Sequence, residues 1–283
     1  GMARQTISRS GGRAAATIGG STARSTSPCR CGKESRSPDG EKTHMRLTCM
    51  PTTPVASVVI RVRNEARYLP ETLTAVEAQS LQPLEIIVVD SGSTDGSVAL
   101  ACQHGARLIA IPPSSFSYGH AINVGAAAAC GPYVVLLSAH AVPCDRDWLA
   151  RLIAPFADRR VAATYSRMLP RPDTPLYQQL NTILMFDLLP TIFGGPAMMY
   201  HNTASAIRRD VWEVARFDET LPACEDTEWA RRIVRLSYRV VFVRNAVVRH
   251  SHNESWRAFA VREGKHAQAW LRMLLGPRKP APG

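Results

Sequence analysis

The sequence predicts an α/β protein with a mostly parallel, Rossmann-like central sheet flanked by helices. Two observations support this fold class. Short runs of β-branched and aliphatic residues alternate with stretches in which apolar residues recur at helical spacing. The runs are also apolar on both faces, which is typical of parallel strands that are covered by helices on both sides.

The first half of the pattern contains four expected strands and three expected helices. The strands are the runs at 56–62, 85–90, 106–111 and 133–138. The helices cover about 67–79, the residues after Asp95, and 121–130. Leu69, Leu73 and Val76 recur at helical spacing, so we expect them to form the buried face of the first helix.

The regular alternation of expected strands and helices ends after Pro143. The expected elements there are a helix at 148–156, a strand at 161–166, a helix at 176–189, a strand at 203–207, helices from 209 and at 225–236, strands at 239–243 and 246–250, and a helix at 254–275. The segment "LPRPDTP" breaks this order with three prolines. We expect it to be a loop that could act as a lid.

Positive charge is concentrated at the amino-terminal end. Of the net charge of +11, residues 1–50 supply more than half, because they hold nine basic and three acidic residues. We expect this segment to be a disordered tail, or to precede a true start at Met45 or Met50. Residues 51–253 then form the main domain, and 254–283 form a carboxy-terminal helix and tail. Charge in a tail gives no reason to expect a nucleic-acid partner.

Cysteine spacing and hydropathy bear on the location of the protein. The seven cysteines are odd in number and irregularly spaced, so we expect reduced thiols and a cytoplasmic protein. No apolar run is long enough to span a membrane. The last helix, "SWRAFAVREGKHAQAWLRMLLG", mixes aromatic and basic residues and could lie peripherally on the inner face of an anionic membrane. Packing against the core or forming a homodimer are open alternatives.

Polar residues directly follow three of the expected parallel strands. They are Arg63-Asn64-Glu65, Asp90-Ser91 and Ser138-Ala139-His140. Ligands of open α/β sheets bind at the carboxyl ends of the strands, so these side chains could line one crevice. The turn "VVDSGSTDGS" could hold a nucleotide base and ribose, or it could be an ordinary strand-to-helix turn with a cap.

Four ordered motifs resemble the family 2 glycosyltransferases. They are "SVVIRVRNEARYL", "IIVVDSGSTDGS", "YGHAINVGAAAACGPYVVLLSAHAVP" and "CEDTEWARRI", and the resemblance covers Pro54 to His252. It implies the GT-A (nucleotide-diphospho-sugar transferase) fold, a divalent metal (Mn or Mg), and inverting transfer of a sugar from a nucleotide-diphospho-sugar donor to a hydroxyl acceptor. Within the family, the chain looks most like bacterial rhamnosyltransferases and cell-surface polysaccharide transferases, which implies a saccharide or lipid-linked acceptor.

The resemblance also implies a nucleotide-sugar site. Asn64 and Glu65 match positions near the ribose and base, and Asp90 matches the acid that holds the base. The other expected contacts are Arg63, Ser91, Asp95, His120, Asn123, Gly125 and Ser138. His120 stands where the family commonly has Arg or Lys, which weakens the expected positive charge on the diphosphate because an imidazole is mostly neutral near pH 7.

Family 2 enzymes usually carry Asp-x-Asp where this chain has Ser138-Ala139-His140. Neutral imidazole can bind a divalent ion there, with a preference for Mn over Mg. His250 and His252 follow an apolar strand and point to one face of it if the strand continues. We expect His140 and one of these two, more so His252, to bind the metal. The alternative is that His140 contacts a phosphate directly.

Glu225 and Asp226 begin an expected helix and match the family's Glu-Asp motif. The resemblance makes Asp226 the expected catalytic base for the acceptor, with Glu225 orienting the acceptor or the metal shell. Favourable charge at a helix N-terminus is the simpler alternative. Residues 202–205 are expected to touch the donor sugar or the acceptor. A catalytically inactive nucleotide-sugar-binding scaffold or regulator stays open as an alternative. A nucleotidyltransferase would need a Gly-rich, Lys-bearing loop that "RVRNEARYL" lacks.

Overall fold

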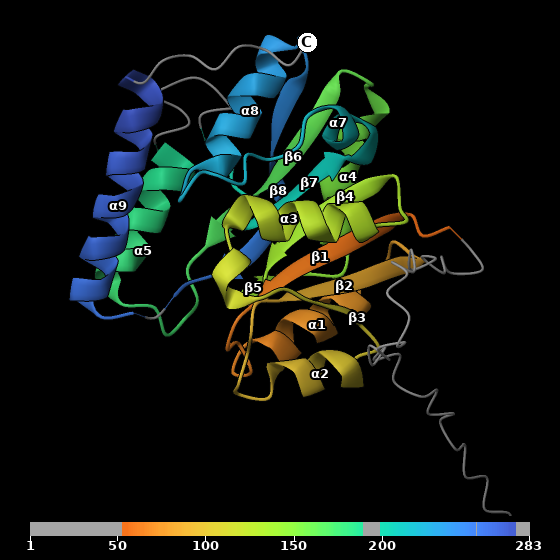
Figure 1. Cartoon of the computed structure of the whole chain (residues 1–283), viewed down its shortest axis with the longest axis horizontal. Helices are drawn as coiled ribbons and strands as arrows, with labels where there is room; N and C mark the ends of the chain where they lie inside the picture. The colour runs from red at the N-terminus through yellow and green to blue at the C-terminus, as the bar shows by residue number, and fades with distance from the viewer. Residues whose placement is uncertain (1–52, 189–198, 253, 276–283) are drawn as a thin grey trace, which may run out of the picture.

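A single twisted sheet with helices on both faces forms the centre of the protein (Figure 1). The computed structural model describes residues 53–188, 199–252 and 254–275. Over these residues the sheet has eight strands in the order β3-β2-β1-β4-β7-β6-β8-β5. The strands are β1 (Ala56–Val62), β2 (Leu84–Asp90), β3 (Arg107–Ala110), β4 (Tyr133–Ser138), β5 (Ala141–Pro143), β6 (Val161–Leu169), β7 (Ala204–Arg208) and β8 (Arg239–His250).

Most of the strands run in the same direction. β1 is parallel to β2 and β4, and β2 is parallel to β3. β7 is antiparallel to β4 and to β6, so β6 and its parallel neighbour β8 again point the same way as β1. Only β5 and β7 run against this direction among the described strands. The predicted α/β fold with a mostly parallel sheet is therefore confirmed, and the carboxyl ends of the other six described strands share one edge.

Helices cover both faces of the sheet. They are α1 (Leu69–Glu77), α2 (Ser97–Gln103), α3 (Tyr118–Ala128), α4 (Trp148–Ile153), α5 (Leu176–Ile183), α7 (Arg209–Val214), α8 (Glu225–Arg235) and α9 (Trp256–Leu275). One core cluster joins the sheet to α1, α2 and α4, and the other joins it to α3, α7 and α8. Because successive strand residues face opposite sides, β1 sends Val58 and Ile60 into the first cluster and Val59 into the second.

Close packing of α3 on the sheet explains the glycine at position 125. A Cβ atom there would lie 2.3 Å from Cγ1 of Val59. The helix could not approach β1 this closely with any larger residue. Gly125, which is also expected to contact the nucleotide sugar, packs closely against the sheet in the structure.

Two expected elements differ in the structure. The runs at 239–243 and 246–250 form one strand, β8, whose pairing with β6 shifts between Ser166 and Arg167. The exposed residues Arg244 and Asn245 lie at this irregularity in the β6–β8 ladder, and no turn separates the two runs. The expected helix after Pro175 is also divided, because α5 continues as one turn of π-helix, η3 (Leu184–Leu188).

Three further expectations concern cysteines, membranes and the chain ends. Cys130 is disulfide-bonded, so the expectation that all seven cysteines are reduced is wrong at this position. No described helix is both long enough and apolar enough to cross a membrane. The expected tail at 1–50 and the end of the chain after residue 275 lie outside the described residues.

Candidate active site

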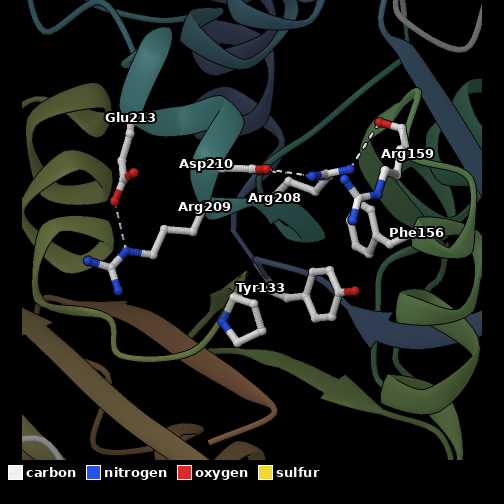
Figure 2. Close-up of a pocket in the computed structure, with 8 residues that line it drawn as sticks. Tyr133, Phe156, Arg159, Arg208, Arg209, Asp210 and Glu213 are labelled. Carbon is white, nitrogen blue, oxygen red and sulfur yellow. Dashed lines mark hydrogen bonds and ion pairs between the residues drawn. The ribbon is translucent and has the colours of Figure 1, made fainter. Parts of the chain in front are cut away.

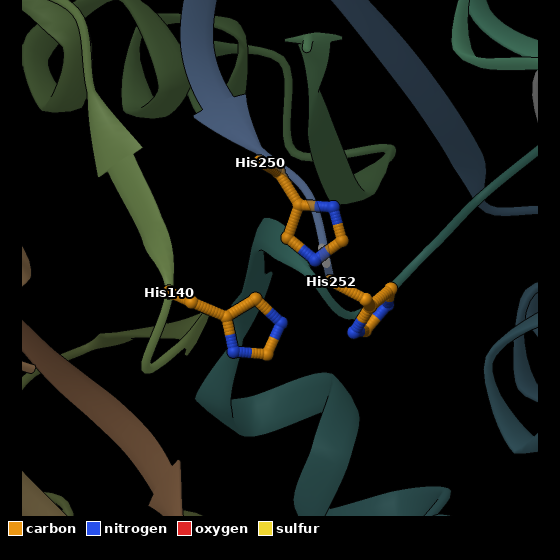
Figure 3. A group of neighbouring side chains, drawn as sticks. All are labelled: His140, His250 and His252. Carbon is orange, nitrogen blue, oxygen red and sulfur yellow. The ribbon is translucent and has the colours of Figure 1, made fainter. Parts of the chain in front are cut away.

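Three histidines meet at the carboxyl edge of the sheet. His140 follows the end of β4, His250 ends β8, and His252 comes two residues later. Their ring centroids lie 4.8 to 4.9 Å apart in all three pairs. Figure 3 shows the three rings turned toward one another. The structure thus brings together all three histidines that were expected to be metal ligands, including His250, which was the less favoured of the later pair.

The cluster fits a divalent metal ion. One ligand nitrogen from each ring can be chosen so that all three lie within 4.8 Å of one another. Nitrogens bound to one tetrahedral ion lie about 3.4 Å apart, given metal–nitrogen bonds of about 2.1 Å. Modest side-chain rotations would therefore complete such a site. Nε2 of His140 is also buried without a hydrogen-bond partner in the part of the chain that the structure describes, as expected of an atom that awaits a ligand.

The surroundings of His250 and His252 favour their neutral imidazole forms. Burial, followed by the charges of His140 and His252, holds the pKa of His250 well below its usual range. Loss of solvation around the ring, followed by the charges of His140 and Arg262, lowers the pKa of His252. A neutral imidazole has a free lone pair, which is the form that binds metals.

The loop after β1 is fixed by the turn after β2. The backbone N–H of Asn64 donates to Ser93 Oγ at 2.9 Å, and Thr94 N donates back to Asn64 Oδ1 at 2.8 Å. Ala66 N donates to Asp95 Oδ2 at 2.9 Å, and a hydrogen bond from Ser97 lowers the pKa of Asp95. Asn64 and Asp95, which were expected to contact the nucleotide sugar, therefore join the two loops at the site.

Asp90 stabilises its own turn. Its carboxylate is buried and accepts hydrogen bonds from the backbone N–H groups of Gly92 and Ser93. Gly92 has a φ of 90°, and a Cβ atom there would lie 2.6 Å from Pro113 Cγ, so the turn requires glycine. Ser91 donates through N and Oγ to Val62 O. The expected base-binding turn is thus tightly ordered.

The segment "HAINVG" forms part of α3 and packs against the loop before α8. All four hydrogen-bonding capacities of Asn123 are used inside the protein. Its Oδ1 accepts from Trp212 Nε1 and Phe217 N, and its Nδ2 donates to Phe217 O and Glu219 Oε1. Nδ1 of His120 lies 2.8 Å from the other oxygen of Glu219. Asn123 therefore has no group left for a ligand, whereas His120 keeps a second ring nitrogen.

Glu225 and Asp226 begin α8, after Cys224 in a left-handed conformation with φ 63°. Burial, and then the charge of Asp226, raises the pKa of Glu225 to about 7, while Arg61 acts in the opposite direction. Burial raises the pKa of Asp226, although N–H groups of Thr227 and Asn202 donate to it. The pair can therefore accept a proton more readily than ordinary surface carboxylates.

The segment before β7 connects the acidic pair to the sheet. Asn202 Nδ2 donates to Glu225 Oε1 at 3.3 Å, and Arg61 donates to the carbonyl oxygen of Asn202 at 3.1 Å. Arg61 was not among the expected site residues, although a charged residue inside an apolar strand was a signal for it. Ser138 contacts this segment through its backbone, because Ser138 N donates a hydrogen bond to Thr203 O. Arg63 is exposed.

A cavity lies away from these residues. It has a volume of about 640 Å³ and is shown in Figure 2. Tyr133, which lines it, begins β4, whereas His140 follows the end of that strand. Its Arg208 pairs with Asp210, and its Arg209 pairs with Glu213. The cavity is therefore at the opposite end of β4 from the histidine cluster.

Residues 57–215 match the family model described as Glycosyl transferase family 2, which is more than half of the chain. The chain belongs to glycosyl transferase family 2. This family 2 member is 29% identical over 70% of its length to the O-antigen chain rhamnosyltransferase RfbN of Salmonella typhimurium. It is 31% identical over 65% of its length to the O-antigen chain rhamnosyltransferase WbaN of Salmonella anatum. The alignments cover 66% and 61% of these relatives, so the chain spans less than two thirds of each.

Solved structures show that the family 2 chain has the GT-A fold. The mannosyltransferase PcManGT from Pyrobaculum calidifontis, in complex with GDP-Man and Mn²⁺, matches with a TM-score of 0.62 and 22% identity. The match covers 81% of this chain and 67% of that one. Glucosyl-3-phosphoglycerate synthase from Mycobacterium tuberculosis, in complex with Mn²⁺, UDP and glucosyl-3-phosphoglycerate, matches with a TM-score of 0.58 and 18% identity, over 80% and 82% of the two chains.

Proposed function

We propose that this protein is an inverting glycosyltransferase that moves a sugar from a nucleotide-diphosphate donor to a hydroxyl acceptor in the synthesis of cell-surface polysaccharide or glycolipid. Membership of family 2 supports the reaction class, and the two O-antigen rhamnosyltransferase relatives support a saccharide or lipid-linked acceptor. GDP-Man and UDP in the two structural neighbours support a nucleotide-linked donor.

The observation that carries the proposal is the cluster of His140, His250 and His252 at the edge where ligands of α/β sheets bind. We assign the divalent metal to this cluster. Three imidazoles without a carboxylate favour Mn²⁺ over Mg²⁺, because Mg²⁺ prefers oxygen ligands. A bound cation would supply positive charge to the diphosphate as it leaves. Mn²⁺ in both structural neighbours supports this choice.

The acidic pair supplies the proton acceptor. In the proposed step, Asp226 takes the proton from the acceptor hydroxyl, and the acceptor oxygen forms a bond to the anomeric carbon. The bond from that carbon to the phosphate oxygen breaks, and its electron pair leaves with the nucleoside diphosphate. Burial raises the pKa of Asp226, which makes its carboxylate a stronger base than one in water. Glu225, beside Asn202, would orient the acceptor.

We place the reaction in the cytoplasm, with peripheral contact to the inner face of a membrane as part of the proposal. Leu176, Leu180, Ile183 and Leu184 lie on one face of the helix formed by α5 and η3 and are 42% to 68% exposed. Figure 1 shows α5 beside α9, whose Trp256 is also exposed. Such a face suits a lipid interface or, alternatively, a second copy of the chain in a homodimer.

Calorimetric titration tests the proposal. UDP, dTDP and GDP would each be added with Mn²⁺, Mg²⁺ or EDTA to the wild type, His140→Ala and His104→Ala. His104 is the matched control because it pairs with Glu77 on α1, outside the cluster. We expect one nucleotide to bind strongly with Mn²⁺ and weakly in EDTA or in His140→Ala, with no change in His104→Ala.

Three other outcomes would contradict parts of the proposal. Binding that is the same in EDTA would remove the metal and leave His140 as a direct phosphate contact. No binding of any nucleotide would contradict a nucleotide-linked donor. Binding of a nucleotide-sugar without release of nucleoside diphosphate in the presence of acceptor saccharides would favour the inactive scaffold.

A further inference from the structure

We infer that Glu65 is a positioning residue for the metal site, which selects the ring form of His140 that can bind the ion. This inference rests on the proposed metal site. Nδ1 of His140 lies 3.1 Å from Oε1 of Glu65. The resemblance placed Glu65 near the ribose, whereas the structure places its carboxylate on the histidine that replaces the family's usual acid.

The contact determines which nitrogen of His140 carries the proton. An ionised carboxylate can only accept a hydrogen bond, so Nδ1 must be the donor. In the neutral ring the lone pair then lies on Nε2. This is the nitrogen that is buried without a partner among the described residues, and Figure 3 shows that edge of the ring facing His250 and His252. Glu65 thus directs the free lone pair toward the cluster.

The position of Glu65 is itself determined by the neighbouring loop. Glu65 N donates to Ser97 Oγ at 2.8 Å, and Ser97 Oγ donates to Asp95 Oδ1 at 2.6 Å. The preceding residue, Asn64, is in the left-handed region with φ 56°, a conformation that asparagine tolerates better than most residues. The turn after β2 therefore holds Glu65 against His140 before any ligand binds.

The contact between Glu65 and His140 is largely shielded from solvent. The side chain of His140 is 12% exposed and that of Glu65 is 23% exposed. The ring of Tyr68 packs edge-on against the ring of His140, with 6.3 Å between the ring centroids. Thr72 Oγ1 donates to the carbonyl oxygen of Ala139 at 2.7 Å. Removal of an outer partner of a metal-binding histidine commonly costs about 10–100-fold in metal affinity.

The test is metal binding in the absence of nucleotide, so that a contact between Glu65 and a ribose cannot contribute. Mn²⁺ would be titrated by calorimetry, and Co²⁺ by its visible spectrum, into the wild type, Glu65→Ala, Glu65→Gln and Glu77→Gln. Glu77 is a matched control, because it contacts Nδ1 of His104 through the same kind of bond at 2.8 Å outside the cluster. Thermal unfolding in EDTA shows whether each variant is folded.

We expect Glu65→Ala to bind both ions about 10–100-fold more weakly than the wild type. Glu65→Gln should lose less metal affinity, because its side-chain carbonyl oxygen still accepts a hydrogen bond from Nδ1 of His140. Glu77→Gln should bind both ions as the wild type does. Wild-type affinity in Glu65→Ala would overturn the inference and leave the metal site intact. No binding of either ion by the wild type would instead overturn the metal site and, with it, this role of Glu65.

A second measurement does not depend on the folding of a variant. ¹⁵N NMR of the histidine rings in wild-type protein with EDTA reports which nitrogen carries the proton. We expect His140 to be protonated on Nδ1 and to have a bare Nε2. A ring protonated on Nε2 would overturn the inference even if Glu65→Ala fails to fold.

Discussion

His140 faces His250 because the residue after His140, Ala141, is paired directly with His250 in the antiparallel ladder between β5 and β8. This short ladder joins the end of β4 to the end of β8 at the carboxyl edge of the sheet. His252 then follows two residues beyond the ladder and completes the cluster. The candidate metal site is therefore a product of strand pairing and not of a local motif.

Removal of any one histidine should weaken metal binding. Each of His140→Ala, His250→Ala and His252→Ala leaves two ligand nitrogens. Loss of a residue that only hydrogen-bonds a metal-binding histidine typically lowers metal affinity about 10–100-fold, so we expect loss of a ligand itself to lower Mn²⁺ affinity at least as much. Calorimetry without nucleotide measures it, with His104→Ala as the control. If His250→Ala binds Mn²⁺ as the wild type does, the site has only two protein histidines.

Asp226→Asn should abolish sugar transfer and preserve binding. The amide is nearly the same size but cannot accept the acceptor proton, and loss of a catalytic base typically costs about 10²–10⁴-fold in rate. Nucleotide and Mn²⁺ affinity should stay unchanged by calorimetry. Glu213→Gln, at the cavity near the start of β4 and so at the opposite end of that strand from the cluster, is the control. A variant that retains wild-type kcat would show that Asp226 is not the base.

The ionisation of Glu225 should appear in the pH profile. Its pKa is raised to about 7 by burial and by Asp226, so the carboxylate form becomes dominant only above that pH. We expect kcat to rise between about pH 6 and 8 in the wild type and to lose this dependence in Glu225→Gln. An acid limb that is identical in the two proteins would assign the ionisation to another group.

His201 should make the protein sensitive to acid. It is buried, its Nε2 lies 3.1 Å from Ser166 O, and burial lowers its pKa to about 4. Between pH 6.5 and 4 the unfolded chain binds this proton and the folded chain does not, so stability falls as the pH falls. The full effect is about 3 kcal/mol. Urea unfolding of His201→Gln should show a smaller loss over this range, and an equal loss would contradict the prediction.

Asn123 should matter for stability rather than for nucleotide binding. Asn123→Ala leaves Trp212 Nε1 and Phe217 N without their acceptor, at a cost of about 1–3 kcal/mol. Urea unfolding measures the loss, and calorimetry on the folded variant should show wild-type nucleotide affinity. A stable variant that no longer binds nucleotide would restore the role that the family resemblance implied.

The periodicity of the sequence was enough to predict the α/β fold. Polar residues at the strand ends, together with the family resemblance, pointed to the three histidines that the structure brings together. The sequence did not reveal the side-chain contacts that depend on packing between distant parts of the chain. The partners of Asn123 come from α7 and the loop that follows it, and the pairing of Glu65 with His140 joins the ends of two strands. No spacing in the sequence encodes either contact.

The same limit applies to β8. Its two apolar runs look like separate strands, and only the pairing with β6 shows that they are continuous. This continuity carries His250 to the edge where β4 ends. The disulfide at Cys130 was also hidden, since the spacing of the cysteines gives no pairing.

The central claim, that His140, His250 and His252 hold the metal of the proposed transfer reaction, is tested most directly by anomalous diffraction from crystals grown with MnCl₂ and a nucleoside diphosphate. We predict one strong anomalous peak within coordination distance of Nε2 of His140 and of one ring nitrogen each from His250 and His252. A nucleotide bound at the carboxyl edge with no peak at the cluster, or with the peak on carboxylates elsewhere, would contradict the account.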